Sequence, residues 1–402
     1  MKQRIYESVT VSRRAEDSIV KGHPWVYDSE ISGEITTPDG DIVDIVNGKG
    51  RYLATGFVNR ASKIRLRVLT RNPNELPTDE GFFERRLERA VDYRRTVMGD
   101  QFGCCRLIFG EADGMPGLTV DRFGDVLVSQ TLCLGMEKRK AEILGALAEL
   151  LRGQGEEIRG IYERNDVSVR GLEGMEQGKG WLECSGDDST DVIITENGIK
   201  YHVDIENGQK TGFFLDQKFN RAAVAQIAKG RRVLDCFTHT GSFALNCAAA
   251  GAESVTAVDI SEEAVAQARR NAQLNGLEDR MNFRAENVFD MLPTIKRGEY
   301  DLIILDPPAF TKSRSTIDSA SRGYKEINLR ALKALPGGGY LATCSCSHFM
   351  DDARFCEMVR AAAADAGAVI RQVEARQQAK DHPVMWSVPE TSYLKFYIFQ
   401  KM

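Results

Sequence analysis

The second half of the chain alternates short apolar strands with helical stretches, and this alternation constrains the fold more than any other feature. From Arg231 onward, separate apolar runs read RRVLDCF, SVTAVDI, MNFRAEN, YDLIILD and GGYLATCS, with helix-forming segments such as SEEAVAQARRNAQLNG between them. This pattern predicts an α/β domain with a doubly wound, mostly parallel sheet. Ligands of such sheets bind beyond the carboxyl ends of the strands. The residues that follow each strand are therefore the first candidates for a functional site.

The first two of these strands end in acidic residues whose spacing suits a nucleoside. Asp235 closes the first strand, and the turn after it, CFTHTGSF, contains one glycine, Gly241. Because the dinucleotide fingerprint needs three spaced glycines, NAD is not expected. Asp259 closes the second strand, where an acid can accept hydrogen bonds from ribose hydroxyls. The pattern predicts S-adenosylmethionine, with Asp235 facing its positive end and Asn287, after the third strand, meeting the adenine amine.

The fourth and fifth strands bring an acid and two thiols to the same edge. The fourth strand is followed by Asp306 and two prolines, which make a rigid loop because each proline locks φ. The fifth strand ends in TCSCSH, with Cys344 and Cys346 one residue apart. A strand continuing through this stretch would place both thiols on one face, so periodicity does not choose between them. Cys346 lies further beyond the strand, nearer the expected cleft.

Several stretches, in order along the chain, resemble a known family. They read KGHPWVYDSEI, RLIFGEADGMPGLTVDRFGDVLV, ENGQKTGFFLDQKFNR, DPPAF, RGYKEINLRAL, SCSH and AKDHPV. Together they resemble the large-subunit ribosomal RNA methyltransferase I family over nearly the whole chain, and the first of them resembles a PUA RNA-binding domain. The resemblance implies a Rossmann-like class I methyltransferase that uses S-adenosylmethionine to place a methyl group on carbon 5 of a cytosine in 23S rRNA.

The resemblance also assigns roles to individual residues. The family pattern Ser-Cys-Ser matches Ser345, Cys346 and Ser347, which implies that Cys346 is the nucleophile and leaves Cys344 at a variable position. Asp306 is the second catalytic candidate, because a carboxylate there could hold the target base. The predicted cofactor contacts are Lys210, Phe214, Gln217, Asp235, Phe237, Thr240, Gly241, Asp259, Asn287 and Asp306. The predicted RNA contacts in the RGYK stretch are Arg322, Tyr324 and Lys325.

Methylation at carbon 5 explains why a thiol would be needed. Carbon 5 of a pyrimidine is a poor nucleophile until a thiolate adds to carbon 6 and turns the ring into an enamine. A base then removes the carbon 5 proton. Enzymes of the two-cysteine type carry a second cysteine directly after Asp-Pro-Pro, where this chain has Ala309, which leaves Asp306 or a water as the base. Two alternatives stay open: N-methylation of guanine, which needs no cysteine, and a non-catalytic RNA-binding assembly factor.

The rest of the chain predicts two smaller domains ahead of the catalytic one. Residues 1–73 read as a β-rich, PUA-like module, residues 74–190 as an α+β middle domain, and residues 191–402 as the methyltransferase domain with an N-terminal hairpin. In KIRLRV, Lys63, Arg65 and Arg67 alternate with apolar residues, so one basic strand face could follow an RNA backbone. The alternative is a solvated edge strand protected by its charges.

Composition bears on which classes of partner, metal site and cellular location fit the chain. The formal net charge of −5 does not by itself indicate nucleic-acid binding. Nine cysteines without a CxxC pair argue against a zinc ribbon or a disulfide scaffold, so no metal is predicted. No apolar run approaches the ~20 residues that cross a bilayer, and the N-terminus lacks a secretory core. We therefore expect a cytoplasmic protein that acts on 23S rRNA and not at a membrane, with edge strands in the middle domain that would allow a homodimer.

Overall fold

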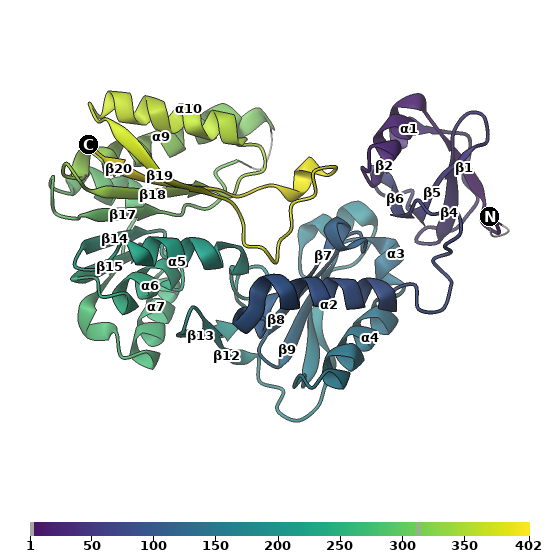
Figure 1. Cartoon of the computed structure of the whole chain (residues 1–402), viewed down its shortest axis with the longest axis horizontal. Helices are drawn as coiled ribbons and strands as arrows, with labels where there is room; N and C mark the ends of the chain where they lie inside the picture. Colours follow the sequence, from purple (N-terminus) through teal and green to yellow (C-terminus); the bar gives the residue numbers. More distant parts are fainter. Residues whose placement is uncertain (1–3, 312–313) are drawn as a thin grey trace. The chain divides into compact units, whose positions relative to one another are not determined.

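The computed structural model describes residues 4–311 and 314–402, and the chain divides into two compact units (Figure 1). The first unit consists of Met1–Ile194, Val203–Leu215 and Lys380–Thr391. The second unit consists of Thr195–His202, Asp216–Ala379 and Ser392–Met402. The chain therefore passes between the units several times, and the predicted boundaries at residues 73 and 190 stay predictions.

The N-terminal part of the first unit is a six-stranded sheet with the order β2-β6-β5-β4-β1-β3. Its strands are β1 (Ser8–Val11), β2 (Trp25–Tyr27), β3 (Ile31–Ser32), β4 (Ile42–Val46), β5 (Tyr52–Val58) and β6 (Ile64–Thr70). The prediction of a small β-rich module is confirmed. The structure adds one helix, α1 (Arg13–Val20), which begins where the Ser12 hydroxyl accepts a hydrogen bond from the Ala15 amide. Ala15 and Ile19, one helical turn apart, bury this helix against the apolar side of the sheet.

The middle of the first unit is a five-stranded sheet covered by helices. Its order is β11-β10-β9-β8-β7, where β7 is Cys104–Phe109, β8 Leu118–Phe123, β9 Val126–Thr131, β10 Gly160–Arg164 and β11 Lys179–Cys184. Helices α2 (Glu84–Met98) and α4 (Lys140–Gly153) lie side by side over it (Figure 1), and the short α3 (Leu134–Glu137) follows β9. One stripe of α2 is buried, since Leu87, Val91 and Arg94 are buried together with Phe83, the residue just before the helix.

The buried face of α2 carries a charge. Arg94, whose side chain is 0% exposed, pairs with both carboxylate oxygens of Asp113 at 2.5 and 2.8 Å. Its Nε donates to the Arg106 carbonyl at 2.9 Å, and its Nη2 donates to the Asp381 carbonyl at 3.1 Å. One guanidinium therefore joins α2, β7 and the returning segment Lys380–Thr391, and no other cation among the described residues pairs with Asp113.

The second unit is built on a seven-stranded sheet with the order β16-β15-β14-β17-β18-β20-β19, and helices cover both of its faces (Figure 1). The strands are β14 (Arg232–Cys236), β15 (Ser254–Asp259), β16 (Met281–Ala285), β17 (Leu302–Leu305), β18 (Tyr340–Ser345), β19 (Ile370–Arg376) and β20 (Lys395–Lys401). Strands β14 to β18 are parallel, and β20 runs antiparallel to both of its neighbours. The predicted doubly wound, mostly parallel sheet is confirmed.

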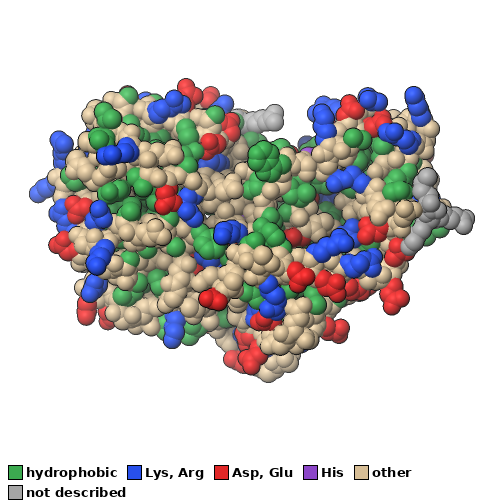
Figure 2. Space-filling model, viewed as in Figure 1, with side chains coloured by type: hydrophobic (Ala, Val, Ile, Leu, Met, Phe, Trp, Pro, Cys, Tyr) green, Lys and Arg blue, Asp and Glu red, His purple; other side chains and the backbone are tan. Residues whose placement is uncertain are grey.

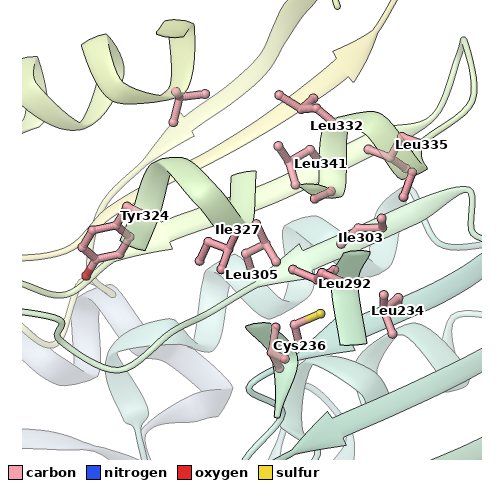
Figure 3. Close-up of a cluster of buried hydrophobic side chains, with 14 of the residues drawn as sticks. Leu234, Cys236, Leu292, Ile303, Leu305, Tyr324, Ile327, Leu332, Leu335 and Leu341 are labelled. Atoms are coloured by element: carbon pink, nitrogen blue, oxygen red, sulfur yellow. The ribbon is translucent and has the colours of Figure 1, made fainter. Parts of the chain in front are cut away.

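Helices cover both faces of this sheet, as its sequence requires. One layer contains α5 (Lys218–Gln226), α6 (Ser242–Ala249) and α7 (Glu262–Leu274), and the other contains α9 (Ile317–Ala334) and α10 (Asp352–Asp365), while the short α8 (Val288–Met291) follows β16. Because both faces are covered, the strands are continuous apolar runs, and every residue of β17 is fully buried. Figure 3 shows the core between sheet and α9, where Leu305 and Leu341 meet Ile327 and Leu332.

The predicted N-terminal hairpin consists of β12 (Asp191–Glu196) and β13 (Ile199–Asp204), and it turns at the first of two Asn-Gly pairs in this segment. Asn197 and Gly198 have φ angles of 53° and 77°, the left-handed conformation that such a turn needs. The second pair, Asn207-Gly208, does not join two strands. Its backbone instead folds onto Asp204, whose carboxylate accepts from the Asn207 amide and whose carbonyl accepts from the Gly208 amide. No helix in the described residues is long and apolar enough to cross a membrane.

Replacing Arg94 with methionine tests the buried pair in α2. Removing one partner leaves the Asp113 charge buried, so Arg94→Met should lower the free energy of unfolding of the first unit by about 3–5 kcal/mol. All three tryptophans, Trp25, Trp181 and Trp386, belong to that unit, so urea unfolding followed by tryptophan fluorescence reports on it. Arg89→Met, at an exposed position of the same helix, should change the free energy of unfolding by no more than about 0.5 kcal/mol. Equal shifts in both variants would contradict this assignment.

Candidate active site

The parallel strands of the second unit bring the predicted carboxylates and the thiols to one edge of the sheet. Asp235 lies at the end of β14, Asp259 at the end of β15, Asp306 directly after β17, and Cys346 directly beyond β18. Because β14, β15, β17 and β18 are paired in parallel register, their carboxyl ends meet there. The predicted residues therefore lie at one edge of the sheet, as the strand-end reasoning expected.

Asp235 is fully buried and has one carboxylate oxygen without a partner. Its Oδ2 accepts hydrogen bonds from the Thr238 hydroxyl at 2.6 Å and from the Ala244 amide at 3.0 Å. Its Oδ1 is buried and accepts no hydrogen bond from any described residue. Burial raises the pKa of this carboxyl to about 7, against the opposing effect of the Thr238 hydrogen bond. A buried acceptor of this kind suits a positively charged ligand group.

The turn after β14 has a backbone shaped for a close approach. Phe237, His239 and Gly241 have φ angles of 64°, 50° and 81°, which residues with side chains seldom adopt. A Cβ atom at Gly241 would lie 2.9 Å from the Cβ of Ala268, so only glycine fits there. The buried Thr240 hydroxyl oxygen finds no hydrogen-bond partner in the described part of the chain. With Asp235 Oδ1, this makes two unpartnered oxygens, a pattern that fits the polar end of the predicted cofactor.

Asp259 is engaged on both carboxylate oxygens. Its Oδ2 accepts from the His239 amide at 2.9 Å, which ties it to the turn after β14, and its Oδ1 accepts from the Ser261 amide at 3.1 Å. Ile260, the residue after it, is 72% exposed, although isoleucine is usually buried. The carboxylate of Asp259 could accept hydrogen bonds from ribose hydroxyls, and the exposed side chain of Ile260 could pack against an adenine ring.

Asn287 caps helix α8, with its side-chain oxygen accepting from the Phe289 amide at 3.0 Å. Sequence reasoning missed the aromatic rings beside it. Phe237, Phe289 and Phe310 form a cluster whose ring centroids lie 5.7–6.4 Å apart. Each of these rings follows the end of a strand, so the signal that located the carboxylates could also have located them.

The structure separates the two cysteines. Strand β18 ends at Ser345, so Cys344 stays inside the sheet, fully buried, whereas Cys346 lies beyond the strand and is partly exposed. The Cys344 thiol donates to Asp306 Oδ1 at 2.8 Å, and burial raises its pKa well above the ordinary value. Cys344 is therefore held as a protonated thiol. The side chain of Gln217, predicted to contact the cofactor, also donates to Asp306 Oδ1, at 3.1 Å.

Asp306 keeps one oxygen available. Both hydrogen bonds to its carboxylate engage Oδ1, and no described residue bonds Oδ2. Burial raises the pKa of Asp306, although the hydrogen bonds from Cys344 and Gln217 oppose this rise. The carboxyl is therefore prepared to exchange a proton with a bound group. Ala309, three residues further on, brings no acid or base to the loop.

Residues 345–347, which we call the Ser-Cys-Ser loop, are held from two sides. The Ser345 hydroxyl donates to the Tyr324 hydroxyl at 3.0 Å, and the Ser347 hydroxyl lies 3.0 Å from the same phenol oxygen. On the other side, Lys395 Nζ donates to the Ser347 carbonyl at 2.7 Å. The loop that carries Cys346 is thus fixed by a helix, α9, and by a strand, β20.

This arrangement corrects the prediction that Tyr324 contacts RNA. Tyr324 is 0% exposed, since its ring packs 4.6 Å from Phe310 and 6.0 Å from Phe355, and its hydroxyl points at the two serines. It belongs to the buried face of α9, which spacing within RGYK does not reveal. Arg322 is exposed and Lys325 is partly exposed, paired with Asp365 at 2.6 Å, and their RNA contacts stay predictions.

The basic strand face in β6 is also corrected. Arg67 is buried and pairs with Glu173 at 2.8 Å and with Glu111 at 3.2 Å, so it is a structural residue of the first unit. The edge-strand alternative is wrong too, because β6 pairs with both β2 and β5. Lys63 is exposed and Arg65 partly exposed, and they remain predicted RNA contacts. On the face shown in Figure 2, Lys and Arg side chains are scattered among Asp and Glu.

Two predicted cofactor contacts fall in the first unit. The Lys210 ammonium lies 5.0 Å from the centre of the Phe214 ring, and Lys210 has a φ of 55°. Their place beside a cofactor stays a prediction. Among the described residues, no group of three or more His, Cys, Asp and Glu side chains could hold a metal ion.

The raised pKa of Asp235 predicts how stability depends on pH. The folded chain holds the Asp235 proton up to about pH 7, whereas the unfolded chain releases it near 3.8, so this carboxyl makes stability fall as pH rises between these values. Asp235→Asn should remove that slope, which amounts to at most about 4 kcal/mol. Thermal unfolding followed by far-ultraviolet circular dichroism from pH 4 to pH 8 measures it.

Asp301→Asn provides the control with the opposite sign. The hydrogen bond from Arg232 lowers the pKa of Asp301, so its stabilising contribution is present above about pH 3.8 and is lost only below it. This variant should differ from the parent by a constant amount between pH 4 and pH 8. A parent slope that persists in Asp235→Asn would contradict the assignment to Asp235.

Comparison with known proteins supports the predicted cofactor and the predicted PUA-like domain. Residues 175–389 match the family model described as S-adenosylmethionine-dependent methyltransferase, and residues 9–71 match the model of a PUA-like domain. The chain is 39% identical to ribosomal RNA large subunit methyltransferase I of Klebsiella pneumoniae strain 342, over 98% of both chains. It is 40% identical to the protein of the same name from Escherichia coli O157:H7, over 96% of this chain and 97% of that one.

Solved structures share the fold at lower identity. A protein described as a SAM-dependent methyltransferase from Streptococcus mutans covers 98% of this chain, and all of that chain is covered, with 21% identity and a TM-score of 0.81. A methyltransferase solved in complex with SAH gives the same coverage and identity, with a TM-score of 0.83. With these matches, the chain belongs to the ribosomal RNA large subunit methyltransferase I family, whose members depend on S-adenosylmethionine.

Proposed function

We propose that this rRNA methyltransferase modifies carbon 5 of a cytosine in 23S rRNA through a covalent adduct with Cys346. The observation that carries the proposal is the contrast between the two thiols. Cys344 is buried and donates a hydrogen bond to Asp306, whereas Cys346 lies beyond the end of β18 on a loop held from two sides. N-methylation of a base gives no reason to fix a thiol at this place.

The proposed reaction begins with the Cys346 thiolate. Its sulfur adds to carbon 6 of the cytosine while N3 of the ring takes a proton, which makes carbon 5 nucleophilic. Bound S-adenosylmethionine would supply the methyl group, and carbon 5 forms its new bond to this methyl as the bond between the methyl and the sulfonium breaks. Loss of the carbon 5 proton then re-forms the ring double bond as the bond between sulfur and carbon 6 breaks, and N3 releases the proton that it took in the first step. The target base must leave its stack to reach the thiol, which favours a flipped or single-stranded cytosine.

Asp306 is the group that would handle the N3 proton. Its Oδ2 bonds no described residue and is available to the base, and burial raises the pKa of the carboxyl, which favours the form that can donate. Cys344 and Gln217 hold Oδ1 and so fix the direction of Oδ2. Because Ala309 brings no acid or base, the carbon 5 proton passes to Asp306, once it is ionised, or to a water.

Replacing each cysteine in turn tests the mechanism. With labelled cofactor and 23S rRNA, Cys346→Ala should lower the rate of methyl transfer by at least about 10³-fold, because the nucleophile is lost. Cys344→Ala removes a buried hydrogen bond and should stay within about tenfold of the parent, on the basis of ~1 kcal/mol per bond. Mapping 5-methylcytosine in the product identifies the position.

Other outcomes would favour the alternatives. Full activity of Cys346→Ala would rule out the covalent mechanism and favour methylation of a base nitrogen. RNA binding by the parent chain without any methyl transfer would favour an assembly factor. An RNA containing 5-fluorocytosine should form a stable adduct with the parent and none with Cys346→Ser, because fluorine cannot leave as the carbon 5 proton does.

Removing the Tyr324 hydroxyl tests the positioning of the loop. Tyr324→Phe loses the hydrogen bonds to Ser345 and Ser347, which should lower the free energy of unfolding by about 1 kcal/mol. We also expect kcat to fall several-fold with little change in KM, because the loop that carries the thiol is no longer held in position. Tyr300→Phe is the control, since its hydroxyl donates one buried hydrogen bond, to Thr256, in the same unit. Equal kinetic effects in the two variants would show that Tyr324 does not position the thiol.

A further inference from the structure

A lysine is buried directly beside the Ser-Cys-Ser loop. Lys395 is the first residue of β20 and pairs across the sheet with Ser345, the last residue of β18. Only 7% of its surface is exposed. Lysine is almost never buried to this extent without a charged partner, because the desolvated ammonium is costly.

The contacts of its ammonium are oriented toward the loop. Nζ donates to the Ser347 carbonyl at 2.7 Å and to the Tyr393 carbonyl at 2.8 Å. An ammonium has three hydrogens to donate, and among the described residues no third acceptor for Nζ is found. One N–H is therefore available beside the Ser347 carbonyl, and Ser347 directly follows Cys346 in the chain.

The charges around Lys395 also point to Cys346 as its partner. No carboxylate in the described chain lies within ion-pair distance of Nζ, and burial lowers the pKa of Lys395 to about 8. The titratable groups that act on it are, in decreasing order, Cys346, Cys344, Asp352 and Asp351. Of the two thiols, Cys344 is held protonated by its bond to Asp306, which leaves Cys346 as the anion this cation can face.

We propose that Lys395 is the cationic partner of Cys346, a positioning residue whose ammonium stabilises the thiolate at the end of β18. When Cys346 gives its thiol proton to solvent, the new negative charge lies beside the buried ammonium. The charge leaves the sulfur as the bond to carbon 6 forms and returns when that bond breaks, so the same cation favours both attack and release. The proposal rests on the function proposed for Cys346, but its test does not require methyl transfer.

The pH dependence of alkylation measures the thiolate directly. The full-length chain, without RNA, is treated with iodoacetamide between pH 5 and pH 10, and the modified Cys346 peptide is quantified by mass spectrometry. In Lys395→Gln the midpoint of this profile should move to higher pH by at least about one unit, because an opposite charge nearby favours the ionised form by that much. Lys395→Arg, which keeps a cation, should stay close to the parent. An unchanged midpoint in Lys395→Gln, or an equal shift in both variants, would overturn the proposal.

Lys401 supplies a matched control on the same strand. It is 8% exposed, and its Nζ also donates to two carbonyls, those of Leu332 and Leu335, both at 2.7 Å. It lies at the other end of β20, next to the start of β18. Lys401→Gln therefore removes a buried ammonium with the same kind of contacts but should leave the Cys346 profile unchanged. The exposed Cys184 serves as an internal reference in every variant.

A reciprocal measurement keeps the proposal testable if Lys395→Gln does not fold. The titration of Lys395, followed by NMR of ¹³C-labelled lysine side chains, should have a lower midpoint in Cys346→Ser than in the parent, because the thiolate that favours the ammonium is gone. Lys401 should titrate alike in both. An unchanged Lys395 midpoint would overturn the pairing.

The two proposals fail separately. If Cys346→Ala methylates normally while Lys395→Gln shifts the alkylation profile, the pairing stands and the covalent mechanism falls. If Cys346→Ala is inactive while the alkylation profile is unchanged, the mechanism stands and Lys395 is only a buried structural lysine.

Discussion

The parallel pairing of β14, β15, β17 and β18 is the constraint on which the rest of the second unit depends. It aligns the carboxyl ends of four strands, so Asp235, Asp259, Asp306 and the Ser-Cys-Ser loop come from distant parts of the chain to one edge. The single antiparallel strand β20 completes the edge from the opposite direction. Because it runs the other way, its first residue, Lys395, meets the last residue of β18.

Burial at this edge acts on acids and bases in opposite directions. The same loss of solvent that raises the pKa values of Asp235, Asp306 and Cys344 lowers that of Lys395. The pKa of Asp235, about 7, and that of Lys395, about 8, thereby approach each other. Groups with such matched affinities exchange protons at little cost, which is what a reaction with several proton transfers requires.

The fold of the second unit and the gathering of the candidate residues at one edge of its sheet could be predicted, because strand–helix alternation and strand ends are local patterns. The features that could not be predicted depend on pairing across the sheets. Helix α1 was hidden in a strand-rich segment, Arg67 meets its glutamates only after two sheets come together, and Tyr324 turns inward because of where α9 packs. Periodicity could not separate Cys344 from Cys346 either, since the end of β18 is fixed by its pairing with β20.

The segment Lys380–Thr391 affects the order in which the parts of the chain can fold. The Asp381 carbonyl accepts from Arg94, its carboxylate accepts from the Arg106 amide at 2.9 Å, and Glu390 lies 3.2 Å from the His23 ring nitrogen. These contacts join residues more than 270 positions apart. During synthesis the N-terminal unit emerges first but waits for nearly the whole chain before its last partners arrive. Folding of the first unit, which contains the PUA-like domain, therefore cannot be completed until most of the second unit has been translated.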